Sequence, residues 1–155
     1  MFDYGLPIRG AVHIGQFIFR DQMIAGKAVV DAHNISESID FSGVCLSTDL
    51  EILIVKSMAQ MKETNFSGED YNSKFWNGHF PHYLCPLKNG QEKRYRIGLW
   101  TNKTHYERDS IQLVRECFWK WGKEIPMVVD AKVKNTAKTI DYFRLSGVEF
   151  IVSLD

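Results

Sequence analysis

The sequence has no excess of charge of either sign, no long hydrophobic run and few cysteines, and each absence excludes a class of protein. Lys+Arg and Asp+Glu both number 19 in 155 residues, so neither the basic surface of a nucleic-acid-binding protein nor an acidic tail is indicated. No apolar run approaches the roughly 18 to 20 residues of a membrane span. The 3 cysteines lie far apart without a secretory signal, which favours reduced thiols and a cytoplasmic location. We therefore expect neither nucleic acid nor membrane as a partner.

Common catalytic motifs are missing as well. The chain contains no phosphate loop of the GxxxxGK[ST] type and no GxSxG nucleophile motif. Cys45 and Cys117 lie in apolar runs, as structural thiols do. What is present is a hydrophobic share of 45% without repeats or low-complexity segments. This composition predicts a single domain over residues 1–155.

The first half of the sequence predicts strands and helices in a mixed order. Residues 8–19 are β-branched and aromatic, and the polar segment 20–22 follows them, which predicts a long strand or a hairpin. Gly26 then opens a segment with helical apolar spacing. The residues expected on the buried face of this helix are Val29, Val30, Ala32, Ile35 and Ile39. Residues 42–47 are expected to form a short buried strand.

A capping box predicts where the next helix begins. Thr48 is followed three residues later by Glu51, and the two side chains can cap each other's backbone N–H groups. Apolar residues then recur at helical spacing: Leu50, Leu53, Ile54, Met58 and Met61.

The second half predicts a loop, a hairpin and two helices. Residues 65–81 read as a long surface loop held by its aromatic residues, namely Phe66, Phe75, Trp76 and Phe80. Asn89-Gly90 joins two alternating runs and favours positive φ angles in a tight hairpin turn. Asp109 or Ser110 caps a helix whose inward residues are expected to be Ile111, Val114, Cys117, Phe118 and Trp121, with Gly122 at its end. After Pro126 a last helix is expected to align Val129, Val133, Ile140 and Phe143 before Gly147. The predicted class is α+β.

Two short motifs resemble those of class III nucleotidyl cyclases, the adenylate/guanylate cyclase homology fold. In that family a strand reading roughly R-x-G-I-H-x-G precedes a hairpin, and a glycine then opens a helix reading G-x-x-V-N-x-A-x-R. Residues 8–15 of this chain read IRGAVHIG and residues 24–34 read IAGKAVVDAHN. The matching steps are Arg9, Val12, His13, Gly15, Gly26, Val29 and Ala32, with Ala11 in place of a glycine. The chain is most similar in character to compact bacterial cyclase-like proteins, some of which are phage-defence pyrimidine cyclases.

The resemblance implies a fold and a place within it. The fold would be a ferredoxin-like, cyclase-type mixed antiparallel sheet with helices packed on one face. Residues 1–104 would correspond to the second half of the cyclase domain, so the sheet would be incomplete at its N-terminal side. Residues 105–155 would form a C-terminal helical extension.

The resemblance also shows which catalytic groups are missing. The family holds Mg²⁺ or Mn²⁺ with two aspartates that lie upstream of the step of Arg9, and Asp3 precedes that strand in the wrong context. Val30 occupies the step of the ribose-orienting asparagine, and Asn34 that of the arginine that neutralises phosphate charge. Loss of one such charge costs on the order of a thousandfold in rate. Met23 occupies the acidic step that recognises the base.

We therefore expect a nucleotidyl cyclase-like domain that is catalytically incompetent as an isolated chain. In the family, such a domain converts a nucleoside triphosphate to a cyclic nucleotide. Positions implied to contact nucleotide are Arg9, Met23, Gly26, Val30 and Asn34; no catalytic residue, metal ligand or cofactor is expected on this chain. The alternative is a noncatalytic nucleotide-binding or protein-interaction module on a cyclase-derived fold. The expected partner is a second copy or a separate N-terminal half, because a cut sheet needs cover.

Other groupings have simpler interpretations. His79, His82 and Cys85 could reach one metal ion, but no fourth ligand is apparent and a loop joining a strand is favoured. Phe75 and Trp76 could stack on a base, although loop aromatics more commonly cover a core. The basic residues of the second hairpin suit its solvated side: Lys88, Lys93, Arg94 and Arg96. Asp31 and His33 are expected on a solvated helix face.

Overall fold

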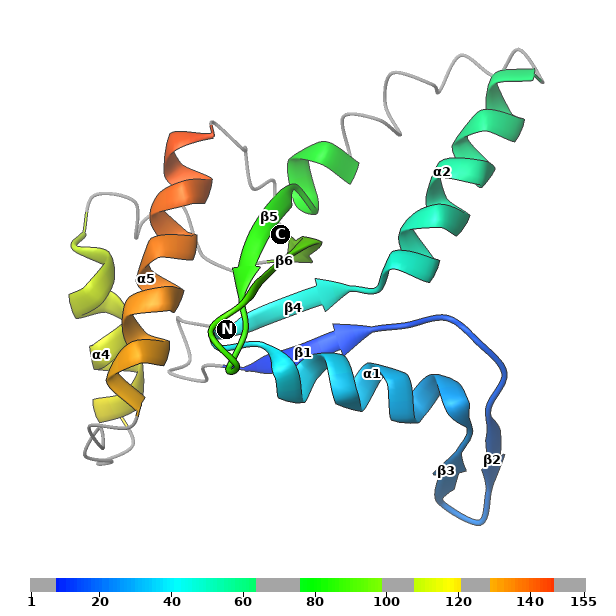
Figure 1. Ribbon diagram of the computed structural model, residues 1–155, viewed down its shortest axis with the longest axis horizontal. Coiled ribbons are helices and arrows are strands. Elements are labelled where there is room, and N and C mark those ends of the chain that lie inside the picture. Colours follow the sequence, from blue (N-terminus) through cyan, green and yellow to red (C-terminus); the bar gives the residue numbers. More distant parts are fainter. Residues whose placement is uncertain (1–7, 64–75, 99–107, 121–128, 147–155) are drawn as a thin grey trace, which may run out of the picture.

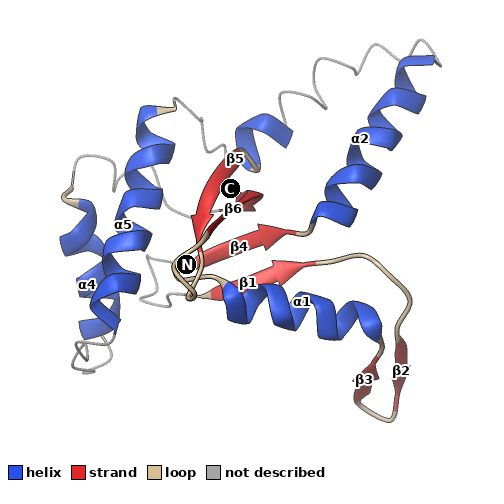
Figure 2. Cartoon of the chain, viewed as in Figure 1, coloured by secondary structure: helices blue, strands red, loops and turns tan. Residues whose placement is uncertain are grey.

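A four-stranded mixed sheet forms the centre of the structure, and a two-stranded hairpin projects beside it (Figure 1). The computed structural model describes residues 8–63, 76–98, 108–120 and 129–146. The strands are β1 Arg9–Val12, β2 Ile18–Arg20, β3 Met23–Ala25, β4 Gly43–Leu46, β5 His82–Pro86 and β6 Glu92–Gly98. The helices are α1 Lys27–Ser38, α2 Thr48–Glu63, α4 Ser110–Trp119 and α5 Asp130–Leu145, and a short helical turn covers 76–79. The α+β prediction is confirmed, as Figure 2 shows.

The strand order of the sheet is β1-β4-β6-β5. β1 and β4 are parallel, with Arg9 opposite Gly43, whereas β6 is antiparallel to both of its neighbours. The connection between the parallel strands consists of the β2–β3 hairpin and α1, which lies along β1 (Figure 1). We call the β2–β3 hairpin, residues 18–25, the arm. Its turn residues Asp21 and Gln22 have φ of 48° and 67°, a left-handed pair that matches the twist of a hairpin. The polar reversal expected at 20–22 is thus confirmed.

One face of the sheet and three helices enclose the core. Cys45, Cys85, Tyr95 and Ile97 point to this face, where α5 covers them and α4 packs against α5. α1 reaches the same core through Ile35. The inward residues of α5 are as predicted: Val133, Ile140 and Phe143 are buried and Val129 packs against them. In α4 the prediction holds for Val114 and Cys117, whereas Ile111 is exposed and Leu113 takes the buried position.

The expectation that all helices pack on one face is wrong for α2. This helix leaves the end of β4 (Figure 1), and Glu51 in its first turn contacts His82 and Arg96 on the face opposite the core. The predicted capping box is wrong too, because Thr48 is already helical. Ser47 is the cap: its Oγ accepts a hydrogen bond from the Leu50 N–H at 3.2 Å. The Glu51 side chain therefore does not cap the helix and contacts the sheet instead.

Two other local predictions need correction. α1 is a helix as expected, but it contains no fully buried residue, and Val29 and Val30 are exposed. At Asn89-Gly90 only Gly90 has a positive φ, of 80°. The Gly90 N–H donates to the Leu87 carbonyl and the Leu87 N–H to the Gln91 carbonyl, so the turn is a type I turn with a glycine bulge. Several predicted residues lie outside the described part of the chain: Phe66, Phe75, Trp121, Gly122, Pro126, Gly147 and the side chain of Met61.

Candidate functional site at the root of the arm

Gly26 joins the arm to α1 in a conformation that only glycine adopts readily. Its φ of 148° and ψ of 161° lie in a region closed to residues with a side chain. A Cβ atom there would lie 2.8 Å from the Gln16 carbonyl oxygen and 2.9 Å from the Phe17 Cα. The Gly26 carbonyl also accepts the first helical hydrogen bonds, from the N–H groups of Val29 and Val30. The glycine is therefore required where the arm ends and α1 begins.

The residues that the cyclase resemblance assigns to three catalytic steps lie on exposed surface. Met23 is an exposed residue of β3, three residues before Gly26. Val30 and Asn34 are both exposed on α1 and lie one helical turn apart, so their side chains share a face. None of the three carries a charge. These three side chains can therefore make apolar and neutral polar contacts, but they bring no charge that could neutralise a triphosphate.

The structure does not bring Arg9 and Val30 together, because Arg9 contacts the opposite end of α1. Its guanidinium pairs with Glu37 in the last turn of the helix, and Lys88 pairs with the same carboxylate at 3.3 Å. The hydrogen bond from Lys88, followed by the nearby Arg9 charge, lowers the pKa of Glu37. Arg9 thus ties β1 to α1 and to the β5–β6 turn.

A buried histidine lies at the root of the arm, where the chain leaves β1. The His13 side chain is 8% exposed, and its Nε2 lies 3.5 Å from Asp31 Oδ2 on α1 and 4.0 Å from Asp49 Oδ2 on α2. Lys27 also approaches Asp31 Oδ2, at 2.5 Å, and this hydrogen bond raises the pKa of Lys27. The His13 Nδ1 has no hydrogen-bond partner among the described residues. Sequence spacing could not predict this cluster, since its members come from three separate elements. Asp31, which we expected on a solvated helix face, is only partly exposed, because it also faces His13.

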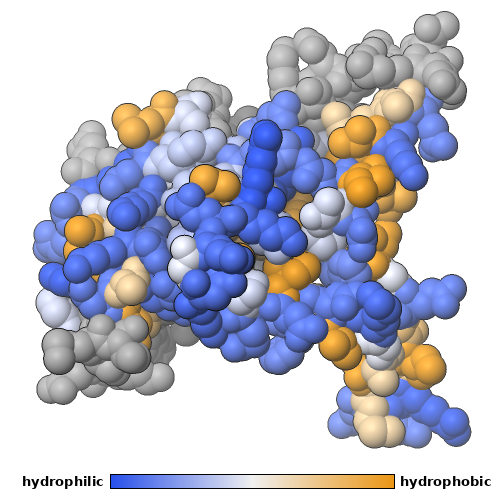
Figure 3. Space-filling view, viewed as in Figure 1, coloured by the Kyte–Doolittle hydropathy of each residue, from blue (hydrophilic) through white to orange (hydrophobic). Residues whose placement is uncertain are grey.

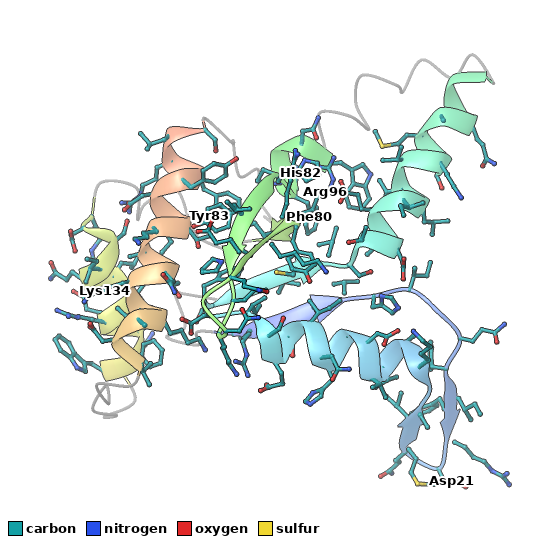
Figure 4. The ribbon with its side chains drawn as sticks, viewed as in Figure 1. Asp21, Phe80, His82, Tyr83, Arg96 and Lys134 are labelled. Carbon is teal, nitrogen blue, oxygen red and sulfur yellow. The ribbon has the colours of Figure 1, made fainter. Side chains whose placement is uncertain are left out.

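A second polar cluster ties α2 to the sheet on the face away from the core. His82 Nε2 and Arg96 Nε both contact Glu51 Oε1. Arg96 also donates to Asn77 Oδ1 at 3.1 Å and to the Phe80 carbonyl at 2.9 Å, and Figure 4 shows His82, Arg96 and Phe80 gathered together. The Arg96 side chain is thus mostly buried and pairs with Glu51. The prediction that Arg96 lies on the solvated side of the hairpin is wrong. Lys93 is different: its Nζ lies over the Tyr95 ring, 5.0 Å from the centroid.

The metal-binding alternative at His79, His82 and Cys85 is not supported by the described geometry. His82 faces Glu51 on one side of the sheet, whereas Cys85 is buried on the other side beside Cys45, with their sulfur atoms 3.9 Å apart. The hydrogen bond with Cys85 and burial raise the pKa of Cys45 far above the ordinary thiol value, so Cys45 stays protonated. In the described ranges, no group of three or more His, Cys, Asp or Glu side chains is placed to hold a metal ion.

The described carboxylates also do not fit the two-metal site of the cyclase family. Asp31 and Asp49 both face His13, and Lys27 already neutralises Asp31. We therefore derive no metal-dependent step from these residues.

The comparisons leave the chain without an established family. No protein-family model, curated protein or solved structure matches it. Among the residues that the structure describes, no helix is long and apolar enough to cross a membrane.

Proposed function

We propose that the chain is the closing half of a class III nucleotidyl cyclase homology domain that has no cyclase activity by itself. The observation that carries the proposal is the order of elements around Gly26. A strand bearing Arg9, with His13 directly after its end, is followed by a hairpin, a helix opened by glycine, a strand parallel to the first, a second helix and a second hairpin. The family's closing half has the same order. The conformation of Gly26 explains why that step keeps its glycine.

The position of β1 supports the idea of a cut sheet. A complete cyclase-type sheet would place the Arg9 strand centrally, whereas within the described ranges β1 pairs only with β4 and is an edge strand. On the face away from the core, Val12 and Leu84 are 45% and 52% exposed. A first half of the domain would supply strands beside β1 and cover this face.

The proposed lack of activity follows from the residues at the catalytic steps. Cyclisation requires an in-line attack of the ribose 3′-hydroxyl on the α-phosphorus, and Mg²⁺ or Mn²⁺ held by the first half would supply the charge neutralisation for this step. Val30 cannot orient a ribose through a hydrogen bond, and Asn34 brings no positive charge. The partner we propose is a separate first half or a second copy. A second copy would still lack the metal-binding aspartates.

A cyclase assay tests the proposed inactivity. Purified chain at 10 μM or so is incubated with ATP, GTP, CTP or UTP and Mn²⁺, and cyclic nucleotides are measured by mass spectrometry, with an active class III cyclase as positive control. We expect no product above a heat-treated sample, because two of the charged steps are neutral and the metal pair is missing. Turnover that heat treatment abolishes would contradict the proposal.

A second candidate function is a noncatalytic module that binds a nucleotide or another protein. The observation that favours it is the exposed apolar surface of the arm, where Ile18, Phe19 and Met23 are all more than half exposed. Calorimetry with the four nucleoside triphosphates, without metal, separates the two forms of this candidate. A nucleotide-binding module would take up one of them with micromolar affinity, whereas a protein-interaction module would bind none.

A further inference from the structure

Lys132 is a half-buried lysine in the first turn of α5. The first turn of a helix carries the positive end of the helix dipole, so a positive charge is disfavoured there. Burial disfavours the charged form as well, because it withdraws the ammonium group from water. Both effects are properties of the fold, and both favour the neutral amine of Lys132.

Two cations and one carboxylate lie near Lys132, where the start of β1, the end of α1 and the β5–β6 turn meet. Arg9 and Lys88 both pair with Glu37, and the Lys88 Nζ lies 3.3 Å from Glu37 Oε2. One carboxylate balances only one of these two cations, so a positive charge remains to face Lys132. Figure 3 shows mainly hydrophilic residues in the region of the β5–β6 turn and the end of α1. Burial, followed by the nearby Arg9 charge, lowers the pKa of Lys132.

The other carboxylates around Lys132 are engaged by other donors. Asp40 Oδ2 accepts a hydrogen bond from the Asn135 side-chain amide at 3.0 Å. Asp130, in the same helical turn, pairs with Lys134 at 2.7 Å. In the part of the chain that the structure describes, no carboxylate lies within ion-pair distance of Lys132. Nothing described there holds its amine in the charged form.

Other lysines of the chain are held in the charged form by a partner. Lys27, Lys88 and Lys134 each pair with a carboxylate, at 2.5, 3.3 and 2.7 Å. An ammonium group has no lone pair, so a lysine becomes a nucleophile where burial or a neighbouring cation favours its neutral form. Exposure alone gives the opposite order of reactivity, because the Lys134 side chain is 58% exposed whereas Lys132 is half-buried.

We propose that Lys132 is an acylation site whose amine takes an acyl group from an activated donor, either an acyl phosphate or an acyl thioester. The Nζ lone pair attacks the acyl carbonyl carbon, and the new C–N bond replaces the C–O bond to phosphate or the C–S bond to the thiol. The phosphate or thiolate leaves with the electron pair of the broken bond, and the nitrogen loses a proton to it. Acylation removes a positive charge from the first turn of α5 and from beside Arg9. The inference is independent of the proposed cyclase origin, because it involves neither a nucleotide nor a second chain.

The test measures the acetylation rate of each lysine in the folded chain. Purified chain is incubated near neutral pH with acetyl phosphate or, in a separate reaction, with acetyl-CoA, and quantitative mass spectrometry follows each site at low conversion. Lys134 and Lys138, which are exposed on the same helix, are the internal references. Both reactions are repeated on chain unfolded in guanidinium chloride.

We expect Lys132 to react at least about threefold faster than Lys134 in the folded chain, because the neutral fraction of an amine rises as its pKa falls. Selectivity with one donor alone assigns the acyl source to that class, and selectivity with both assigns it to activated acyl groups in general. The preference should vanish in the unfolded chain. Equal rates at Lys132 and Lys134 with both donors would overturn the proposal, and so would a preference that persists in the unfolded chain.

A pair of variants separates the effect of charge from that of exposure. Lys88→Gln removes a positive neighbour and leaves Glu37 more open to Lys132, so acetylation of Lys132 should slow at least about twofold. Lys138→Gln is the matched control, an exposed lysine further along α5, and should leave the rate at Lys132 unchanged. Far-UV circular dichroism verifies that both variants keep their helices. A Lys88→Gln chain in which Lys132 reacts as fast as in the wild-type chain would overturn the proposal.

Discussion

At the residue scale, the proposed relation to the cyclase family depends on a glycine and on the two residues that follow it on α1. Gly26 has the backbone conformation that joins the hairpin to the helix, whereas Val30 and Asn34 lie on the next turns without the groups that the family uses at the steps proposed for them. The sequence assigns these three residues only through the spacing of a motif. The contacts of His13 with Asp31 and Asp49 could not, because no motif connects a strand end to two later helices.

Gly26 and Gly90 both have a positive φ, but only Gly26 is also closely packed. Substituting each of them therefore separates the energetic cost of the backbone conformation from that of the close contact. Gly26→Ala places a methyl group against the backbone of residues 16 and 17, whereas a Cβ at Gly90 meets nothing within 4 Å. We expect Gly90→Ala to lower the free energy of unfolding by about 1 kcal/mol and Gly26→Ala by about 3 kcal/mol. Urea denaturation of the two variants measures the difference. Equal losses would show that the contact at residues 16 and 17 has no energetic weight.

At the element scale, the sequence predicts which segments form helices and strands, but not which of these segments contact one another. Periodicity identified α5 and its inward residues, because a single buried stripe determines that helix. It failed for the cap of α2, where Glu51 has partners on strands 31 and 45 residues further along the chain. It also gave no warning that Thr136 is fully buried, since its hydroxyl accepts a hydrogen bond from the Ser42 N–H of a distant segment. Long-range polar contacts of this kind leave no local pattern.

The start of α2 provides a test of the corrected cap. Ser47→Ala removes the oxygen that accepts the Leu50 N–H, so we expect the free energy of unfolding to fall by about 1 kcal/mol. Thr48→Ala is the matched control and should change it by less than about 0.3 kcal/mol, because Thr48 is exposed in the first helical turn. Thermal or urea denaturation compares the two. A larger loss for Thr48→Ala would restore the capping box that the sequence predicts.

At the scale of the whole molecule, the described residues form one buried core and leave two surfaces uncovered. The core is continuous from β4 through β6 and β5 to α5, and its thiols are sealed within it. The edge of β1 that has no partner strand among the described residues and the exposed apolar residues of the arm lie outside it. The arm residues could be recognised as apolar from the sequence, but their exposure depends on how the hairpin projects, which no pattern of residue types determines.

The buried Cys45 thiol predicts a loss of stability at alkaline pH. Its pKa is raised in the folded chain by the hydrogen bond with Cys85 and by burial, so above the ordinary thiol pKa the unfolded chain loses a proton that the folded chain keeps. Between pH 9 and 10 the free energy of unfolding should therefore fall by up to about 1.4 kcal/mol per pH unit from this residue alone. Urea denaturation of Cys45→Ala over the same pH range should show a shallower slope. An unchanged slope would assign the alkaline loss to other groups.

The central proposal is that β1 is an open edge of the described sheet, where the strands of a first half would pair. Amide hydrogen exchange of the purified chain tests it strand by strand, with β6 as the internal reference because it is hydrogen-bonded to a strand on each side. The account predicts that alternate amides of β1, those that point away from β4, exchange as fast as amides of the exposed arm, whereas the amides of β6 exchange slowly. Protection of every β1 amide to the level of β6 would contradict it.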